Sequence, residues 1–272
     1  MNPVYSIING EFILEDEAAL AISDLSIMRG FGIFDFFRTL NYQPVFLEDH
    51  LDRFYFSALE MFMDVGYDRH QLSKLIQQLI DKNKIPNSGI RITLTGGYAE
   101  DNYSMTKPNM LITQSPFTFD KDKFNKGTSL VTYQHQRQLP QVKTIDYLMA
   151  IRLQHFIKEH NADDVLYHNG NEVCECPRSN FFIVTKHDEV ITPAKNILRG
   201  ITRKKILGFS EFNICEGTIK PEDMFNIKEA FIASTTKNIL PVLKIDGKEI
   251  GDGKPGEITR DIYERLFSIK EN

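Results

Sequence analysis

The segment from Ile90 to Thr95 alternates strictly between apolar and polar side chains. Successive side chains of a β-strand point to opposite faces, so this strand directs Ile90, Ile92 and Leu94 to one side and its polar residues to the other. It follows two stretches with helical spacing, one starting near Asp49 and one capped by Asp68. The order of these patterns along the chain favours an α+β or mixed α/β fold over a doubly wound parallel one.

Further periodic segments fill the N-terminal part of the chain. The Asn9-Gly10 turn between two short apolar runs predicts a β-hairpin, and residues 32–39 and 110–113 predict two more strands. Each of the two helices is expected to bury one apolar face. In the first helix this face consists of Leu51, Phe54, Ala58, Leu59 and Phe62, and in the second of Leu72, Leu75, Ile76, Leu79 and Ile80.

The C-terminal part mixes strands and helices. We expect helices over about 145–160, after Thr202 and over about 256–267, an Asp246-Gly247 hairpin, and strands around Val165, Val173, Phe182, Ile214 and Phe231. Between the two parts the chain is polar and has no periodicity. The predicted organisation is therefore a small N-terminal domain of residues 1–116, a linker of residues 117–126 and a larger C-terminal domain of residues 127–272.

The composition is that of an ordinary soluble globular protein, with 42% hydrophobic and 25% charged residues. A formal net charge of -5 argues against a nucleic-acid partner, and no apolar run has the length of a membrane-spanning helix. The three cysteines fit reduced thiols, and the spacing of Cys174 and Cys176 lacks a second pair of metal ligands. We therefore expect a cytoplasmic protein that binds small molecules and no metal.

Three segments between residues 143 and 203 offer the kinds of group that pyridoxal 5'-phosphate (PLP) requires. Lys143 offers an amine, Glu175 lies in a strand among apolar neighbours, and Gly200-Ile201-Thr202-Arg203 opens a helix with Thr202 as its expected N-cap. PLP requires an amine for its aldehyde, a charge partner for its pyridine nitrogen and donors for its phosphate. We therefore expect PLP as the cofactor and Lys143 as the catalytic residue.

Each of these residues also has a simpler explanation when it is taken alone. A lone lysine is usually a solvated surface charge, and Glu175 could be a solvent-facing strand residue. Most helix starts bind no ligand, and Thr235-Thr236 could be turn residues rather than donors to a phosphate or carboxylate. The arginines that could grip an anion could equally form surface salt bridges; they are Arg29, Arg53 and Arg91.

Taken together, these residues resemble the class IV, or fold-type IV, PLP enzymes, which comprise D-amino-acid transaminases, branched-chain aminotransferases and aminodeoxychorismate lyases. His50-Leu51-Asp52-Arg53 is similar to the family's phosphate-binding arginine motif. Glu175 with Ser179-Asn180 resembles its glutamate strand, and Leu198 to Arg203 resembles its phosphate turn. The resemblance covers nearly the whole chain. It implies a small N-terminal α/β domain, a larger C-terminal pseudo-barrel domain and a homodimer with shared active sites.

The resemblance also implies roles for individual residues. Lys143 would hold the cofactor covalently, Glu175 would face the pyridine nitrogen, and Tyr147 would contact the phenolic oxygen. Other cofactor-binding residues would be Arg53, Ser179, Ile201, Thr202 and Thr235. The substrate would contact Phe34 and Thr236. Arg178 replaces the small residue usual at its position, and we hypothesise that it reaches the phosphate.

The sequence is less specific about the substrate. Thr95-Gly96-Gly97 lacks the arginine that D-amino-acid transaminases and the lyases carry there, and Arg91 falls where branched-chain enzymes have an arginine. Residues 234–248 nevertheless read most like the D-amino-acid branch. We infer that Arg29, from the same or the neighbouring subunit, and Arg91 clamp the substrate carboxylate, and we favour a transaminase of D-amino acids and 2-oxo acids.

Three alternatives remain open from the sequence. Two are enzymes of the same family, a branched-chain L-amino-acid aminotransferase and an aminodeoxychorismate lyase. The third is a cofactor-binding protein without turnover.

Overall fold

The computed structural model describes residues 3–120 and 122–271, whose contacts divide the chain into two compact units. Unit 1 comprises Met1–Thr118 and Val142–Asp146, and unit 2 comprises Phe119–Gln141 and Tyr147–Asn272. The division falls within the segment expected to be a linker, where a short helix, α4 (Asp122–Lys126), also forms. The short segment that carries Lys143 packs with unit 1, whereas the sequence placed residue 143 in the C-terminal domain.

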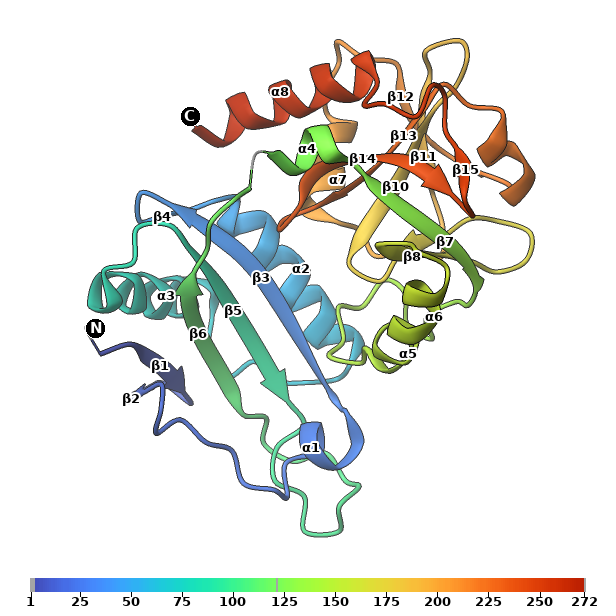
Figure 1. The fold of residues 1–272 in the computed structure, drawn as a ribbon. Helices are drawn as coiled ribbons and strands as arrows, with labels where there is room; N and C mark the ends of the chain where they lie inside the picture. The colour runs from blue at the N-terminus through green and yellow to red at the C-terminus, as the bar shows by residue number, and fades with distance from the viewer. Residues whose placement is uncertain (1–2, 121, 272) are drawn as a thin grey trace. The chain divides into compact units, whose positions relative to one another are not determined.

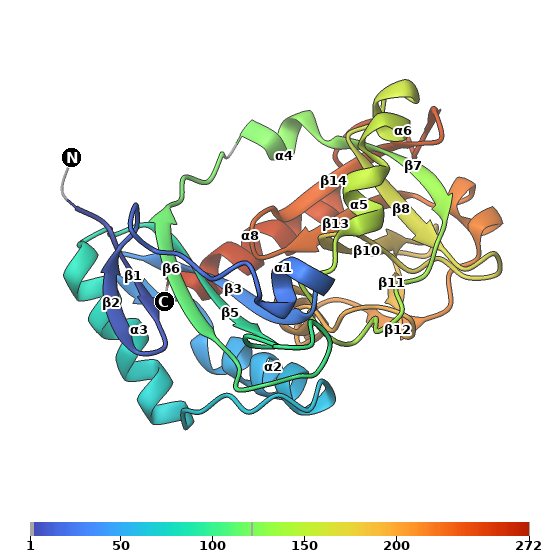
Figure 2. The ribbon, with the colours of Figure 1, turned by 90° about the horizontal axis from the view of Figure 1, so that it is seen from below.

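Unit 1 is built on a six-stranded antiparallel sheet in the order β2-β1-β6-β5-β3-β4. The strands are β1 (Tyr5–Ile8), β2 (Glu11–Leu14), β3 (Gly32–Leu40), β4 (Gln43–Pro44), β5 (Ser88–Thr95) and β6 (Met110–Pro116). The helices are α1 (Leu25–Arg29), α2 (Leu47–Glu60) and α3 (Arg69–Asn83). Figures 1 and 2 show α2 and α3 on one side of this sheet.

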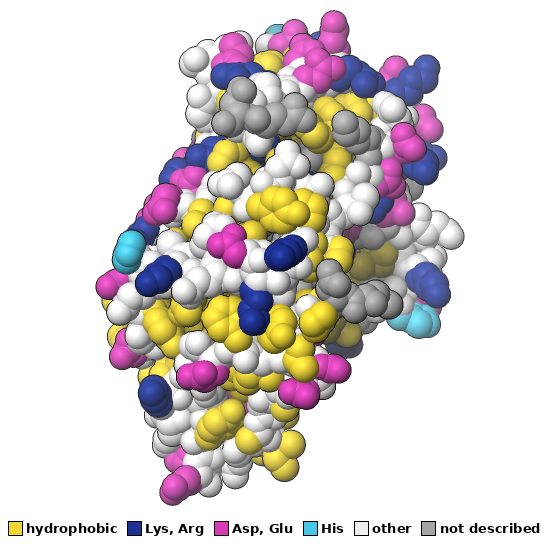
Figure 3. Space-filling model, turned by 90° about the vertical axis from the view of Figure 1, so that its left-hand side faces the viewer, with side chains coloured by type: hydrophobic (Ala, Val, Ile, Leu, Met, Phe, Trp, Pro, Cys, Tyr) yellow, Lys and Arg dark blue, Asp and Glu magenta, His cyan; other side chains and the backbone are white. Residues whose placement is uncertain are grey.

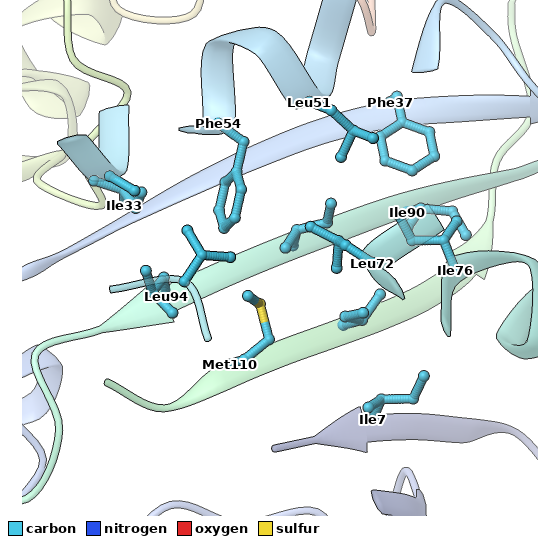
Figure 4. Close-up of a cluster of buried hydrophobic side chains, with 14 of the residues drawn as sticks. Ile7, Ile33, Phe37, Leu51, Phe54, Leu72, Ile76, Ile90, Leu94 and Met110 are labelled. Carbon is cyan, nitrogen blue, oxygen red and sulfur yellow. The ribbon is translucent and has the colours of Figure 1, made fainter. Parts of the chain in front are cut away.

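The core of unit 1 lies between this sheet and its two long helices (Figure 4). Ile90, Ile92 and Leu94 of β5 are fully or almost fully buried, which confirms the face predicted from their alternation. The predicted hairpin at Asn9-Gly10 is confirmed as β1 and β2. Asp68 caps α3 through a capping box, and the apolar face of that helix is buried as predicted, Leu75 only partly. Local periodicity was therefore sufficient to place these elements.

The predicted face of α2 is wrong at its C-terminal end. Leu59 is 71% exposed and Phe62 is 86% exposed, whereas Ala58 is buried as expected. The helix ends at Glu60, and Phe62 adopts a positive φ of 54° that reverses the chain. Met63 then donates its N–H to the Ala58 carbonyl and occupies the core in place of Phe62.

Unit 2 contains a mixed nine-stranded sheet whose main path runs β12-β11-β10-β13-β14-β7-β8, with β9 paired to β10 and β15 paired to β14. The strands are β7 (Thr128–Gln134), β8 (Asp164–His168), β9 (Glu175–Cys176), β10 (Ser179–Val184), β11 (Val190–Pro193), β12 (Ile214–Gly217), β13 (Glu229–Ser234), β14 (Asn238–Ile245) and β15 (Lys248–Glu249). Besides α4, the helices are α5 (Leu148–Arg152), α6 (Gln154–Glu159), α7 (Ile201–Leu207), α8 (Glu257–Glu271) and the 3-10 helix η1 (Pro221–Phe225).

Strand β10 is the centre of unit 2, and all six of its residues are buried. Phe182 packs in one apolar cluster with residues of α7 and α8, and Phe181 packs in a different cluster with strand residues such as Ile232. A strand that is covered on both faces is a rigid support for side chains at its ends. The combination of sheets and helices in the two units confirms the α+β class.

Three local predictions in unit 2 are wrong. The helix expected over 145–160 is two short helices, α5 and α6, joined at the buried Leu153, and residues before 147 are not helical. Val173 forms only an isolated bridge with His168, and the strand begins at Glu175. Gly200, not Thr202, is the N-cap of α7, so Thr202 is the second residue of that helix.

Charged side chains of both signs are interspersed with apolar ones on the face that Figure 3 shows. Among the described residues, no helix is long and apolar enough to cross a membrane. No group of three or more His, Cys, Asp or Glu side chains in the described ranges could hold a metal ion. Cys174 and Cys176 are buried free thiols.

Candidate active site

The Lys143 segment is an extended stretch beside strand β3 in unit 1. Phe34 donates its N–H to the Lys143 carbonyl at 2.9 Å, and Lys143 donates its own N–H to the Ser57 hydroxyl at 3.2 Å. The buried Val142 anchors the segment in the unit 1 core. The backbone of Lys143 is therefore fixed on both sides, and its half-buried side chain extends from a rigid base.

Two cationic side chains share the ring of Phe34. The Lys143 amine lies 4.6 Å from the ring centroid, and the Arg91 guanidinium carbon lies 4.2 Å from it. Cations are attracted to the face of an aromatic ring at such distances. The structure thus brings together three of the residues selected from the sequence, an amine, a guanidinium and an aromatic ring.

Arg53 belongs to a buried cluster of charged and polar side chains between α2 and β3. Its Nε and Nη2 atoms each donate to one carboxylate oxygen of Asp35, both at 2.8 Å, and His50 Nδ1 lies 2.7 Å from Asp35 Oδ1. Asp35 is fully buried and Arg53 is 9% exposed. This bidentate pair fixes the plane of the guanidinium, so Nη1 is the nitrogen that remains for a ligand.

The charges in this cluster determine its protonation. Burial by itself would raise the pKa of Asp35, but the charges and hydrogen bonds of Arg53 and His50 outweigh burial and hold that pKa well below its ordinary value. Burial lowers the pKa of His50, and the Asp35 carboxylate only partly opposes this effect. His50 is therefore neutral near pH 7 and donates its Nδ1–H to Asp35. The charge of Lys143 also lowers the pKa of His50, so this cluster is electrostatically coupled to the candidate catalytic amine.

Arg29 is the last residue of α1 and is exposed. Its guanidinium donates to the Met28 carbonyl at 2.9 Å. Asp24 caps this helix and also accepts hydrogen bonds from Thr95 and Asn109, which attaches α1 to the end of β5.

Glu175 in unit 2 is 5% exposed and is surrounded by donors. Both of its carboxylate oxygens lie 3.0 Å from the Leu198 N–H, Asn180 Nδ2 donates to Oε2 at 3.1 Å, and Arg137 Nη1 lies 3.5 Å from Oε1. Burial of a carboxylate requires such partners. Within the protein, Arg137 is a cationic partner of this carboxylate, and the sequence did not identify it.

The other predicted cofactor residues of unit 2 gather around one end of its sheet. Ser179 begins β10, and the register of β10 with β13 places it beside the turn that contains Thr235 and Thr236. Ile201 and Thr202, both buried, form the first turn of α7, where backbone N–H groups have no intrahelical acceptor. Thr235 is half-buried and Thr236 is exposed.

The hydroxyl of Ser179 is buried and has no hydrogen-bond partner among the described residues. Native proteins rarely leave a buried hydroxyl in this state, because the lost hydration is not compensated. A bound anion would supply the missing acceptor. Of the two further residues predicted to bind the cofactor, Arg178 is exposed in the β9–β10 turn and Tyr147 is half-buried at the start of α5.

Comparison with known proteins identifies the family. The model of the family described as amino-transferase class IV matches residues 32–245. The D-alanine aminotransferase of Staphylococcus haemolyticus is 32% identical over 266 residues, which cover 94% of each chain. That of Bacillus licheniformis is 27% identical over 266 residues, covering 95% of this chain and 94% of the relative. The chain therefore belongs to the class IV aminotransferases, enzymes that move an amino group between an amino acid and a 2-oxo acid.

Solved structures show the same fold. The branched-chain amino acid aminotransferase from Escherichia coli matches with a TM-score of 0.87 and 21% identity, covering 99% of this chain and 95% of the other. The branched-chain aminotransferase from Thermoproteus uzoniensis with norvaline matches with a TM-score of 0.85 and 25% identity, covering 98% and 94%. The predicted fold-type IV architecture is confirmed by these likenesses.

Proposed function

We propose that this class IV aminotransferase binds PLP and transfers amino groups between D-amino acids and 2-oxo acids. The observation that carries the proposal is the position of the Lys143 amine and the Arg91 guanidinium on one aromatic ring, Phe34. An amino acid carries its carboxylate on the carbon from which the proton is removed. A guanidinium close to the catalytic amine can therefore hold the substrate while the amine acts on it.

The residues present fit PLP. The buried Ser179 hydroxyl lacks an acceptor, which a phosphate oxygen would supply. Arg53 offers a fixed guanidinium nitrogen, and Ile201, Thr202 and Thr235 offer backbone or hydroxyl donors, which are groups of the kind that bind a phosphate. Arg178 is a further candidate for this contact. The buried Glu175 carboxylate is an acceptor for the pyridine N–H, and Tyr147 is a candidate donor to the phenolic oxygen.

PLP, when it is bound, supplies an electron sink for the bond that breaks at the substrate α-carbon. In the proposed mechanism Lys143 holds the cofactor and then accepts and returns the substrate proton. Glu175 would keep the pyridine nitrogen protonated, and the Arg137 and Leu198 donors orient the Glu175 carboxylate. Arg91 and Arg29 hold the substrate carboxylate, while Phe34 and Thr236 line the site around the substrate.

The preference for D-amino acids rests on two features. The two relatives compared by sequence above are D-alanine aminotransferases that match over 94% of their length. In addition, Arg91 with Arg29 provides a carboxylate clamp that the chain does not provide at Thr95-Gly96-Gly97. The side on which the carboxylate is anchored decides which face of the α-carbon Lys143 reaches. A clamp of two arginines therefore also fixes the stereochemistry.

We further propose a cytoplasmic homodimer in which Arg29 of the partner subunit completes each site. Several large apolar side chains of unit 1 are exposed in the single chain, as partners in an interface would be; they are Ile22, Leu59, Phe62 and Tyr103. Mixing two inactive variants tests the shared site. If Arg29 acts across the interface, refolded mixtures of Arg29→Ala and Lys143→Ala recover about a quarter of wild-type activity, since half of the dimers then contain one complete site. If Arg29 acts within its own chain, the mixtures remain inactive.

The experiment that tests the function is a half-reaction panel. The purified protein, loaded with PLP, is mixed separately with D-glutamate, D-alanine, L-leucine and aminodeoxychorismate, and the visible absorption of the cofactor is followed. We expect loss of the band with the D-amino acids alone. Conversion by L-leucine alone would establish the branched-chain alternative, and release of pyruvate from aminodeoxychorismate would establish the lyase.

A further inference from the structure

The side chain of Asn180 lies between the Glu175 carboxylate and the segment that leads into α7. We propose that Asn180 is a positioning residue that fixes the orientation of Glu175 by tying it to the 198–200 segment. This inference rests on the proposed function, in which Glu175 receives the pyridine N–H of PLP. The contacts of Asn180 themselves do not depend on that function.

Hydrogen bonds form a closed network around Asn180, which is 4% exposed. Its Nδ2 donates to Glu175 Oε2 at 3.1 Å and to the Leu198 carbonyl at 2.8 Å. The N–H of Leu198 in turn donates to both oxygens of Glu175 at 3.0 Å. Both neighbours of the amide nitrogen, the Glu175 carboxylate and the Leu198 carbonyl, are acceptors. The donor end of the Asn180 amide must therefore face them, which fixes the orientation of the amide group.

The backbone of Asn180 is equally fixed. It pairs with Glu175 across β9 and β10 and with Ala233 across β10 and β13. The hydrogen bond from Asn180 to Glu175 thus joins the side chains of two residues that lie directly opposite each other on neighbouring strands. Because β10 is buried on both faces, Asn180 cannot move without disturbing the centre of unit 2.

Gly200 provides the space that the Asn180 side chain requires. A Cβ atom on Gly200 would lie 2.1 Å from Asn180 Oδ1, far inside contact distance. The backbone of Gly200 has φ of -65°, which any residue can adopt, so the requirement for glycine is one of space. The amide of Asn180 therefore packs directly against the residue that caps α7.

An asparagine suits this position better than an aspartate. An aspartate has no N–H to donate to Glu175 or to the Leu198 carbonyl, and it would place a second negative charge about 3 Å from the first. Two neighbouring carboxylates would favour protonation of one of them. Glu175 would then be a weaker acceptor for the pyridine N–H. The substitution is therefore expected to change the protonation of the bound cofactor and not only the stability of the fold.

The first test measures PLP affinity in the full-length protein with three variants. We expect Asn180→Ala and the isosteric Asn180→Asp to weaken PLP binding roughly 10-fold or more, because each removes a hydrogen bond to a charged group. The matched control is Asn83→Ala, since Asn83 is a buried asparagine of unit 1 whose amide also donates to a backbone carbonyl and a side-chain oxygen. We expect the control to bind PLP with wild-type affinity even if it lowers stability.

The second test uses the contact with Gly200. Gly200→Ala should weaken PLP binding as Asn180→Ala does, because its methyl group displaces the amide. The double variant Gly200→Ala with Asn180→Ala should bind no more weakly than Asn180→Ala, since the collision is then removed. Losses that multiply in the double variant would overturn the proposal.

A spectroscopic measurement separates positioning from a purely structural role. The pH titration of the visible band of bound PLP should shift in Asn180→Asp and stay unchanged in Asn83→Ala. If wild-type protein does not bind PLP, the proposed function fails. If it binds PLP but the Asn180 variants bind with the same affinity and the same pH titration, the positioning role alone fails. If both Asn180 variants fail to fold, the Gly200→Ala variant decides. A PLP affinity equal to that of the wild-type protein would then overturn the positioning role of Asn180.

Discussion

Replacement of Asp35 by asparagine removes the counter-ion of Arg53 while keeping the shape of the side chain. In the native protein the Asp35 carboxylate accepts hydrogen bonds from two nitrogens of Arg53, from His50 Nδ1 and from the Phe36 N–H. The amide of asparagine keeps one acceptor oxygen and presents an N–H where an acceptor is required. The Arg53 guanidinium would then be buried without a charged partner.

Breaking a buried ion pair by removing one partner typically costs about 3–5 kcal/mol. We expect a loss of this size in the free energy of unfolding of unit 1, because Asp35 is fully buried and both Arg53 contacts are 2.8 Å long. At about 1.4 kcal/mol for each factor of ten, the loss corresponds to a change of two to three and a half orders of magnitude in the unfolding equilibrium constant.

Amide hydrogen exchange measured by mass spectrometry at matched PLP concentration provides the assay, because it reports unit 1 separately from unit 2. The slowest amides of β3 and α2 should exchange faster in Asp35→Asn by the factor given above. The control is Asp52→Asn. Asp52 lies in the same helix, α2, and forms an exposed ion pair with Arg69, so its loss should change the free energy of opening derived from exchange by less than about 1 kcal/mol. A loss below about 1 kcal/mol in Asp35→Asn would refute the reasoning.

Three further perturbations test other features of the fold. Acidification should lower the free energy of unfolding of unit 1, measured by urea titration, from about pH 6.5 downward. Burial lowers the pKa of His50 in the folded protein, so the unfolded chain binds the proton first. The pKa of Asp35 is also lowered in the folded protein, so a further loss of stability begins as the pH falls below 3.8, the ordinary pKa of this group. His50→Gln should abolish the upper part of this dependence. Gly97→Ala should be far more destabilising in thermal unfolding than Gly66→Ala, since both glycines have positive φ but only at Gly97 does a Cβ meet backbone, 2.1 Å from a carbonyl oxygen. Glu229→Ala should cost about 2 kcal/mol in urea unfolding, because this carboxylate accepts two N–H groups of the first turn of α8 and a threonine hydroxyl.

Elements whose signal is local could be predicted from the sequence. Strand β5 and helix α3 were predicted correctly because their periodicity and the Asp68 cap act over a few residues. The face of α2 was extended too far because periodicity gives no information on where the chain reverses. Phe62 continues the apolar spacing, and only the structure shows that Met63 replaces it in the core.

The candidate site residues were chosen from the sequence by residue type and motif, but the contacts that hold them in place were not predicted. Lys143 and Glu175 were selected as an amine and as a carboxylate among apolar neighbours, and Arg53 was selected because its segment resembles the family's phosphate-binding motif. Asp35 and Arg137 were missed because their contacts join residues separated by 18 and 38 positions in the sequence. Asp35 carried one signal, an acidic residue in the middle of an apolar strand, which requires a buried partner.

The covalent link between PLP and Lys143 is the most direct test of the proposed function. Reduction of the purified, PLP-loaded protein with borohydride, followed by proteolysis and mass spectrometry, identifies the residue that carries the cofactor. The proposal predicts a permanent mass increase on the peptide containing Lys143, and no labelling in Lys143→Ala. Labelling of another lysine, or no labelling of the wild-type protein, would contradict it.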